Sequence, residues 1–117
     1  MSNYVKKMPN IPSFKQNGFD GYNIETDNKN ISITFEDVYE KHEKYCTNTK
    51  STHFYFVVDG NGKFKINNDI YEVGKDDLIE IPPNNKFVVS GRMKLLLIMN
   101  PEYNEENDIA GEDNDLD

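Results

Sequence analysis

The 117-residue chain lacks the cysteines of disulfide-linked or zinc-binding proteins and the long apolar runs of membrane proteins. It contains one cysteine, five prolines and no tryptophan, and it has no run of about 18 apolar residues that would cross a membrane as a helix. The single cysteine, Cys46, cannot close an internal disulfide and has no second thiolate with which to share a zinc ion. We therefore expect a domain without cross-links or a membrane span, in which Cys46 is a small, largely buried side chain.

Positive charge is scarce as well. The chain has 13 Lys and Arg against 21 Asp and Glu, a formal net charge of −8. Eight of the acids and none of the bases lie beyond residue 101, which leaves 13 acids against 13 bases before it. A neutral body with an acidic end offers no basic surface to phosphate, so we predict no nucleic-acid partner. No apolar stretch follows the first lysines, so no secretory signal is apparent and we expect a cytoplasmic protein.

Composition divides the chain into three regions. Residues 1–30 hold scattered apolar side chains without a sustained period, and we expect an arm there with one short strand near residues 4–8. Residues 31–101 hold most of the periodic apolar content and form the predicted barrel domain. In residues 102–117 the apolar content collapses while acidic residues accumulate, which predicts a disordered tail.

Short β-branched and aromatic runs recur from residue 31 onward. They occupy residues 31–35, 53–58, 63–66, 70–73, 78–81, 87–89 and 93–99. Between them lie clusters of glycine, proline, asparagine and aspartate that are typical of tight turns, at residues 59–62, 67–68, 74–77, 82–85 and 90–91. Strands of this kind with a turn every 8–12 residues or so predict an all-β fold, a sandwich or a closed barrel. The polar stretch 36–50 has no clear period, and we favour an edge strand that runs into residues 45–47.

Two segments carry a resemblance to a known family. The first is His53-Phe-Tyr-Phe-Val-Val-Asp-Gly60, an aromatic and valine-rich strand that ends in a glycine. The second is Asp76-Asp77-Leu-Ile-Glu-Ile-Pro-Pro83, in which Asp76 stands in the place of a glycine. In this order they resemble the two motifs of the cupin family, over roughly residues 31–101. The resemblance implies a small antiparallel β-barrel, the double-stranded β-helix of jelly-roll type, and a homodimer, which cupins commonly form.

The resemblance also indicates where metal-dependent cupins hold their ion. Those positions fall on Thr47, Thr49 and His53, and the histidine of the second motif is replaced near Phe87. Threonine is a poor ligand for the ions that imidazole sites select, phenylalanine has no ligand atom, and one imidazole alone does not hold a divalent ion. We therefore predict no metal and no cofactor. A shifted site stays open because the register of residues 36–50 is not fixed; it would comprise Glu40, His42, Glu43 and His53.

The candidate ligand-binding residues follow from the strand period and the resemblance together. Alternate side chains of a strand share one face, so His53, Tyr55 and Val57 point the same way. In cupins that face lines the barrel interior, where His53 would act as a general base or a hydrogen-bond donor. The alternative is a structural histidine. The predicted interior set consists of Tyr45, His53, Tyr55, Phe87 and Val89.

Three other polar residues are expected to lie outside this set. His42 sits among glutamates and lysines in residues 40–44, a pattern typical of a solvated edge. Asp77 belongs to a turn, where its carboxylate is expected to accept backbone hydrogen bonds. Arg92, the only arginine, follows a predicted turn and is expected to be exposed.

Three functions are compatible with these observations. The first is a metal-independent cupin-fold domain that binds a small molecule, such as a carbohydrate-like ligand, in the barrel interior. The second is an enzyme of the isomerase or epimerase kind, with His53 as base and a tyrosine as acid, which fold resemblance alone suggests. The third is a dimeric interaction or assembly protein whose acidic tail contacts a basic partner. The sequence does not decide whether the protein is an enzyme.

Overall fold

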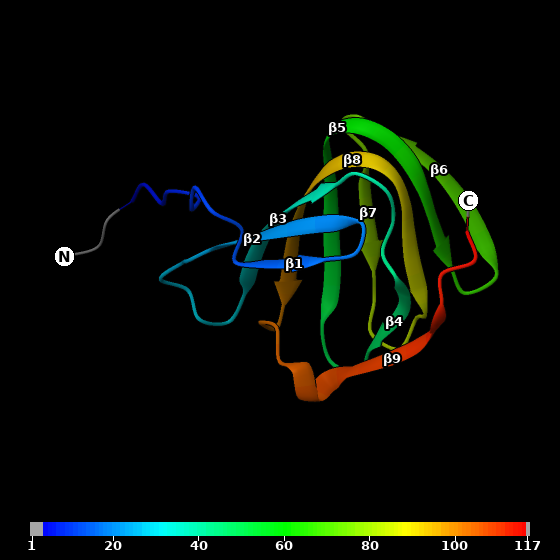
Figure 1. Cartoon of the computed structure of the whole chain (residues 1–117). Helices are drawn as coiled ribbons and strands as arrows, with labels where there is room; N and C mark the ends of the chain where they lie inside the picture. Colours follow the sequence, from blue (N-terminus) through cyan, green and yellow to red (C-terminus); the bar gives the residue numbers. More distant parts are fainter. Residues whose placement is uncertain (1–3, 117) are drawn as a thin grey trace.

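The computed structural model describes residues 4–116 as an antiparallel sheet curled into a half-barrel (Figure 1). This part of the chain forms nine strands and one short 3-10 helix: β1 (Phe14–Gln16), β2 (Phe19–Ile24), β3 (Ser32–Val38), β4 (Lys44–Asn48), β5 (Thr52–Ile66), β6 (Asp69–Gly74), β7 (Leu78–Ile81), β8 (Phe87–Asn100), η1 (Glu105–Asn107) and β9 (Asp108–Asp113). The predicted all-β antiparallel fold is confirmed. Among the described residues no helix is long and apolar enough to cross a membrane.

Strands β5 and β8 are the longest, with 15 and 14 residues, and the other elements assemble around them. They pair from Thr52↔Asn100 to Ile66↔Phe87, with one irregularity in register between Val57 and Asp59. Strands β6 and β7 attach to β5, whereas β3 and β4 attach to β8. Figure 1 shows the two long strands arching together over the molecule. This curved pair gives the half-barrel its concave inner face.

The curvature of β5 and β8 depends on glycines at which the sequence predicted turns. The clusters at residues 59–62 and 90–91 lie inside β5 and β8, not between strands, and the prediction of turns there is wrong. Gly62 pairs with Gly91, and a Cβ built on Gly91 would lie 2.6 Å from the Gly62 Cα. Gly91 also has φ 124°, a conformation that side chains rarely adopt. The two strands can bend and approach this closely because neither residue has a side chain.

Other turn predictions are confirmed. Asn67, with φ 55°, and Asn68 connect β5 to β6, since Ile66 pairs with Asp69 across a two-residue loop. In the next turn the Asp77 carboxylate accepts a hydrogen bond from the Gly74 N–H at 2.8 Å, as expected for a structural role.

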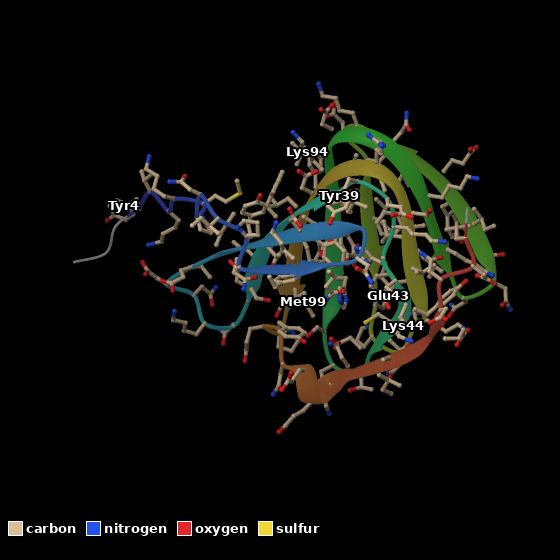
Figure 2. All side chains as sticks on the ribbon, viewed as in Figure 1. Tyr4, Tyr39, Glu43, Lys44, Lys94 and Met99 are labelled. Atoms are coloured by element: carbon tan, nitrogen blue, oxygen red, sulfur yellow. The ribbon has the colours of Figure 1, made fainter. Side chains whose placement is uncertain are left out.

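The N-terminal region contributes more to the sheet than the sequence indicated. Residues 4–8 form no strand, and Tyr4 lies far out on the arm with 96% of its surface exposed (Figure 2). Strands β1 and β2 form a hairpin within the same region, and β2 pairs with β3 from Phe19↔Val38 to Ile24↔Ile33. The sheet therefore begins before residue 31, where the sequence placed the start of the barrel.

The C-terminal region also differs from the expectation of a disordered tail. Strand β9 pairs with β4, and Leu116 is 6% exposed in a small cluster with Tyr45 and Val88. Lysines from the body meet the acids of this segment, as in the 2.9 Å ion pair between Lys44 and Asp113 and the pair between Lys86 and Glu112. The prediction of disorder is wrong because the composition of the segment does not include the lysines of the body that pair with its acids.

The main core lies on the concave face. His53, Tyr55 and Val57 are 5%, 2% and 0% exposed, so the strand period predicted their shared inward face correctly. The apolar residues buried with them come from most of the strands: Phe19, Val38, Phe64, Ile79, Ile81, Phe87, Val89, Met93, Leu95, Leu97 and Met99.

The close approach of the long strands can be tested by adding one methyl group. Gly91→Ala should lower the free energy of unfolding by at least about 2 kcal/mol, because it strains a positive φ and forces a Cβ against Gly62. Gly74→Ala is the matched control, since its Cβ would meet no atom closer than 3.8 Å and should change stability by less than about 0.5 kcal/mol. Urea denaturation of both variants measures the difference. Equal stabilities would contradict this explanation of the bend.

Candidate functional site

A cavity of about 870 Å³ occupies the concave side of the sheet. Its lining comes from the β1–β2 hairpin, from β3, β4, β5 and β8, from the connections before and after β3, and from β9 with the chain before it. The walls contain aromatic and aliphatic side chains, among them Phe19, Tyr55 and Leu97. They also contain a few ionisable side chains, among them Glu36, His42, His53 and Asp108. This mixture of apolar walls with few polar groups is typical of a small-molecule site.

One polar pair in the cavity wall is formed by His42 and Glu36. The His42 Nε2 lies 2.9 Å from Glu36 Oε1, and the two side chains are only 12% and 5% exposed. The His42 ring also lies against Phe19, with 4.3 Å between ring centroids. The Glu36 carboxylate accepts a hydrogen bond from Nε2–H, which leaves Nδ1 as the nitrogen with a free lone pair. No described residue hydrogen-bonds Nδ1. A largely buried imidazole oriented by a carboxylate is equipped for proton transfer.

The sequence predicted His42 on a solvated edge, and this prediction is wrong because the side chain points into the cavity. His42 lies between β3 and β4, in a loop held by backbone hydrogen bonds. Its N–H donates to the Val89 carbonyl at 3.0 Å, and the N–H groups of Tyr39 and Glu40 donate to the Gly18 carbonyl. These bonds to the β1–β2 turn and to β8 place His42 beside Glu36, and no local periodicity in residues 40–44 indicates them.

The other polar pair in the cavity consists of His53 and Tyr55. Their rings are stacked at 5.9 Å, and the Phe87 ring lies 5.0 Å from His53 and 5.9 Å from Tyr55. No residue of the described chain hydrogen-bonds the His53 ring or the Tyr55 hydroxyl. Both groups therefore have hydrogen-bonding capacity that a ligand in the cavity can use.

Burial fixes the protonation of this second pair. Removal from water lowers the pKa of His53 below its ordinary 6.5, in spite of the opposing charges of Asp108 and Glu36. Removal from water also raises the pKa of the Tyr55 hydroxyl well above its ordinary 10.0. Near neutral pH, His53 is therefore uncharged and Tyr55 keeps its proton as a hydrogen-bond donor.

Asp108 lines the cavity although the sequence does not predict it there. It opens β9, pairs with Asn48, and accepts a 2.7 Å hydrogen bond on Oδ1 from the Asn48 side-chain amide. Burial and then the charge of Asp108 raise the pKa of the neighbouring Cys46 thiol to about 12, so the thiol keeps its proton near neutral pH. Asp108 reaches the cavity through the pairing of β9 with β4, and nothing in the acidic composition of residues 102–117 indicates that pairing.

The remaining predicted site residues have different positions. Tyr45 borders the cavity, but its ring packs with Val88 and Leu116 and its hydroxyl donates to Asp115. Val89 is fully buried in the main core and is not part of the cavity lining. Tyr45, His53, Tyr55 and Phe87 thus surround or border the same space. Their roles as ligand contacts stay predictions.

The residues at the family's metal positions do not fit a metal ion. Of Thr47, Thr49, His53 and Phe87, only His53 offers a strong ligand. The shifted set is not assembled either, since Glu40 and Glu43 are exposed and Glu43 instead accepts a hydrogen bond from Asn17. Within residues 4–116 no three His, Cys, Asp or Glu side chains converge in an arrangement that could hold a metal.

Comparison with known proteins identifies the fold. No family model matches the chain, and no curated protein does. Among solved structures, Streptomyces Pac13 in a variant with uridine has 24% identity, a TM-score of 0.88, and covers 96% of this chain and 93% of its own. The Cnp3 cupin domain of Schizosaccharomyces pombe has 12% identity and a TM-score of 0.66, over 74% of this chain and 66% of its own. Ectoine synthase from P. lautus has 12% identity and a TM-score of 0.67, over 89% and 83%.

These similarities show that the chain has the cupin fold, as its two motifs implied. The similarity to Pac13, which is described as a nucleoside dehydratase, extends over nearly the whole of both chains.

The burial of neutral His53 predicts a specific dependence of stability on pH. Its folded-state pKa lies below 6.5, so the unfolded chain binds the proton first as the pH falls. Stability due to neutral His53 is complete above pH 6.5 and is lost progressively as the pH falls toward the folded pKa. The free energy of unfolding of the wild type, minus that of His53→Gln, should therefore decrease between pH 7.5 and 5. Urea titrations at several pH values measure this difference; a constant or rising difference would show that His53 is not desolvated.

Proposed function

We propose that the cavity binds a small neutral ligand of the nucleoside class, without a metal, and that His42 and Glu36 act on it as an acid–base pair. The observation that carries this proposal is the buried 2.9 Å contact between the two side chains in the cavity wall. The extended similarity to Pac13, which has been solved with uridine, supports the choice of ligand class.

The chemistry of the cavity suits a nucleoside. Such a ligand has a flat ring with apolar faces, which Phe87 and Phe19 can contact, and polar edges, which the Tyr55 hydroxyl and the neutral His53 can bind. The Asp108 carboxylate is a suitable acceptor for sugar hydroxyls. Acids outnumber bases in the lining, with Glu25, Glu36, Glu43, Glu102 and Asp108 against Lys15, Lys29 and Lys44. This excess favours an uncharged ligand over a phosphorylated one.

The acid–base pair suits the removal of water from such a ligand. His42 Nδ1 would take a proton from a carbon next to a carbonyl, and the electrons of that C–H bond would form a C=C bond. The C–O bond to the neighbouring carbon would then break, and the imidazolium would return its proton to the departing hydroxide as water. Glu36 would stabilise the imidazolium through Nε2–H in both steps. We assign His53 to recognition, because no carboxylate orients its ring and burial disfavours its charged form.

The proposal is tested first by binding. Uridine should saturate a site that perturbs the NMR signals of Tyr55, Phe87 and Leu97, and uridine 5′-monophosphate should bind more weakly. Tyr55→Phe removes one hydrogen-bond donor and should weaken uridine binding by about 2- to 10-fold. Tyr71→Phe makes the same change on exposed β6 and should leave the affinity unchanged. Perturbations confined to the outer surface, or equal effects of the two variants, would rule out this site.

The same experiment extends to conversion. Nucleosides whose sugar carries a carbonyl are incubated with the protein, and mass spectrometry follows the loss of one water. His42→Gln and Glu36→Gln should each reduce the rate by about 10²- to 10⁴-fold. The control Glu40→Gln changes an exposed carboxylate in the same region and should be as active as the wild type. Conversion that survives in His42→Gln would assign the base to another residue.

We also infer that the protein is a homodimer, because the convex face of the sheet is apolar and uncovered. Cross-strand pairs put the apolar side chains of this face side by side: Phe35, Phe54, Phe56, Leu78, Leu96 and Ile98. Leu78 and Phe56 are 60% and 38% exposed. An apolar patch on this scale is typical of an interface, and a second copy presents the same patch.

Light scattering coupled to size-exclusion chromatography tests the dimer. The wild type should have twice the 13.6 kDa mass of one chain, and the double variant Phe56→Lys, Leu78→Lys should have the mass of one chain. Ile70→Lys adds a single lysine on exposed β6, and this control should remain dimeric. A monomeric wild type would contradict the inference, and it would also remove the support for an assembly role.

A further inference from the structure

The end of the acidic C-terminal segment contacts the loop that carries His42. Asn114 follows β9 and is 8% exposed. Its side-chain amide donates to the His42 carbonyl at 2.7 Å and to the Val89 carbonyl at 3.1 Å. Its backbone N–H donates to the Glu43 carbonyl at 2.8 Å. One residue of the segment therefore binds the main chain at His42, at the residue after it, and on the strand behind it.

The position of Asn114 is itself fixed. Its Oδ1 accepts a 2.8 Å hydrogen bond from the Leu116 N–H, and Leu116 packs against Tyr45 and Val88. Its carbonyl oxygen accepts from Lys41 Nζ at 3.3 Å. The side chain therefore uses both amide hydrogens and its oxygen, and a buried apolar neighbour anchors it from the other side. A side chain bound in this way has little freedom to move.

The His42 loop depends on these contacts because regular strand pairing does not hold it. The nearest pairing is the isolated bridge between Lys41 and Ser90, and His42 adds one backbone bond to Val89. Without Asn114 the His42 carbonyl would lose its side-chain donor in a part-buried position. Leaving a buried carbonyl without a donor is unfavourable, and a short loop can avoid that cost by adopting another conformation.

We propose that Asn114 is a positioning residue for His42, and that the acidic C-terminal segment completes the site by fixing this loop. Its catalytic meaning rests on the function proposed above for His42 and Glu36. The placement of the His42 ring can be measured without any ligand, so the two proposals can fail separately.

The protein offers a convenient reporter, because its only histidines are His42 and His53. The His42 ring lies 4.3 Å from the Phe19 ring, and the ring current of Phe19 should shift its proton signals. The His53 ring lies 5.0 Å from Phe87 and is the internal reference, because the hydrogen bonds of the Asn114 side chain go to His42, Val89 and Leu116. Proton NMR of the full chain thus follows the two rings separately.

Asn114→Asp is the informative variant. It keeps an oxygen for the Leu116 N–H but removes both donors to the carbonyls of His42 and Val89. The ring-current shift of His42 should be lost, and carbethoxylation of His42 by diethyl pyrocarbonate should become at least tenfold faster, while His53 keeps its signals and its reactivity. Asn104→Asp is the matched control, because its side chain caps η1 and aspartate caps equally well.

The outcomes separate positioning from a general effect on stability. Unchanged His42 signals and reactivity in a folded Asn114→Asp variant would overturn the proposal. Equal changes at His42 and His53 would overturn it as well, since they would show general loosening. Should Asn114→Asp fail to fold, Asn114→Ser gives the same test, because its short side chain can still cap locally but cannot reach both carbonyls. A positive result in a protein that does not bind uridine would retain the positioning role and reject the nucleoside.

Discussion

The pairing of β5 with β8 is the constraint on which the rest of the molecule depends. Fourteen residues of each strand form antiparallel pairs, with one irregularity in register between Val57 and Asp59, while both strands bend through the Gly62–Gly91 contact. The bend converts a flat ladder into a curved one and brings the inner faces of β3, β4 and β5 toward a common space. His53 and Tyr55 on β5, and Phe87 on β8, reach the cavity by the alternation of side chains along these strands. The cavity is therefore a consequence of how two strands pair.

The two ends of the chain complete what the central pair begins. The β1–β2 hairpin adds Phe19, which packs against His42, and β9 adds Asp108 beside Asn48. Asn114 then fixes the main chain at His42. Each contribution joins residues that are far apart in sequence, so the ionisable groups of the cavity assemble only when both ends are in place. The acidic C-terminal segment is therefore part of the candidate site and not an appendage to the barrel.

The sequence predicted those features that depend on local pattern. Alternation along residues 53–58 gave the inward face of His53, Tyr55 and Val57, and the Asn67–Asn68 pair gave a true hairpin turn. Gly60, Gly62 and Gly91 do not reveal from the sequence whether they form turns, because a turn and a sharp bend within a strand require the same backbone freedom. The inward turn of His42 and the ordering of β9 could not be predicted, since both depend on hydrogen bonds and ion pairs between distant segments. The charged residues around His42 and the acids of the tail suggested solvent exposure, whereas their partners are residues of other segments, such as Glu36 for His42 and Lys44 for Asp113.

The central proposal is that the concave cavity is a nucleoside site in which the Glu36–His42 pair faces the ligand. A crystal structure of the protein grown with uridine measures this directly. We expect density for one nucleoside between the Tyr55 and Phe87 rings on one side and His42 on the other, with the contact from His42 Nε2 to Glu36 preserved. A cavity closed by its own side chains, or uridine bound only outside it, would contradict the claim.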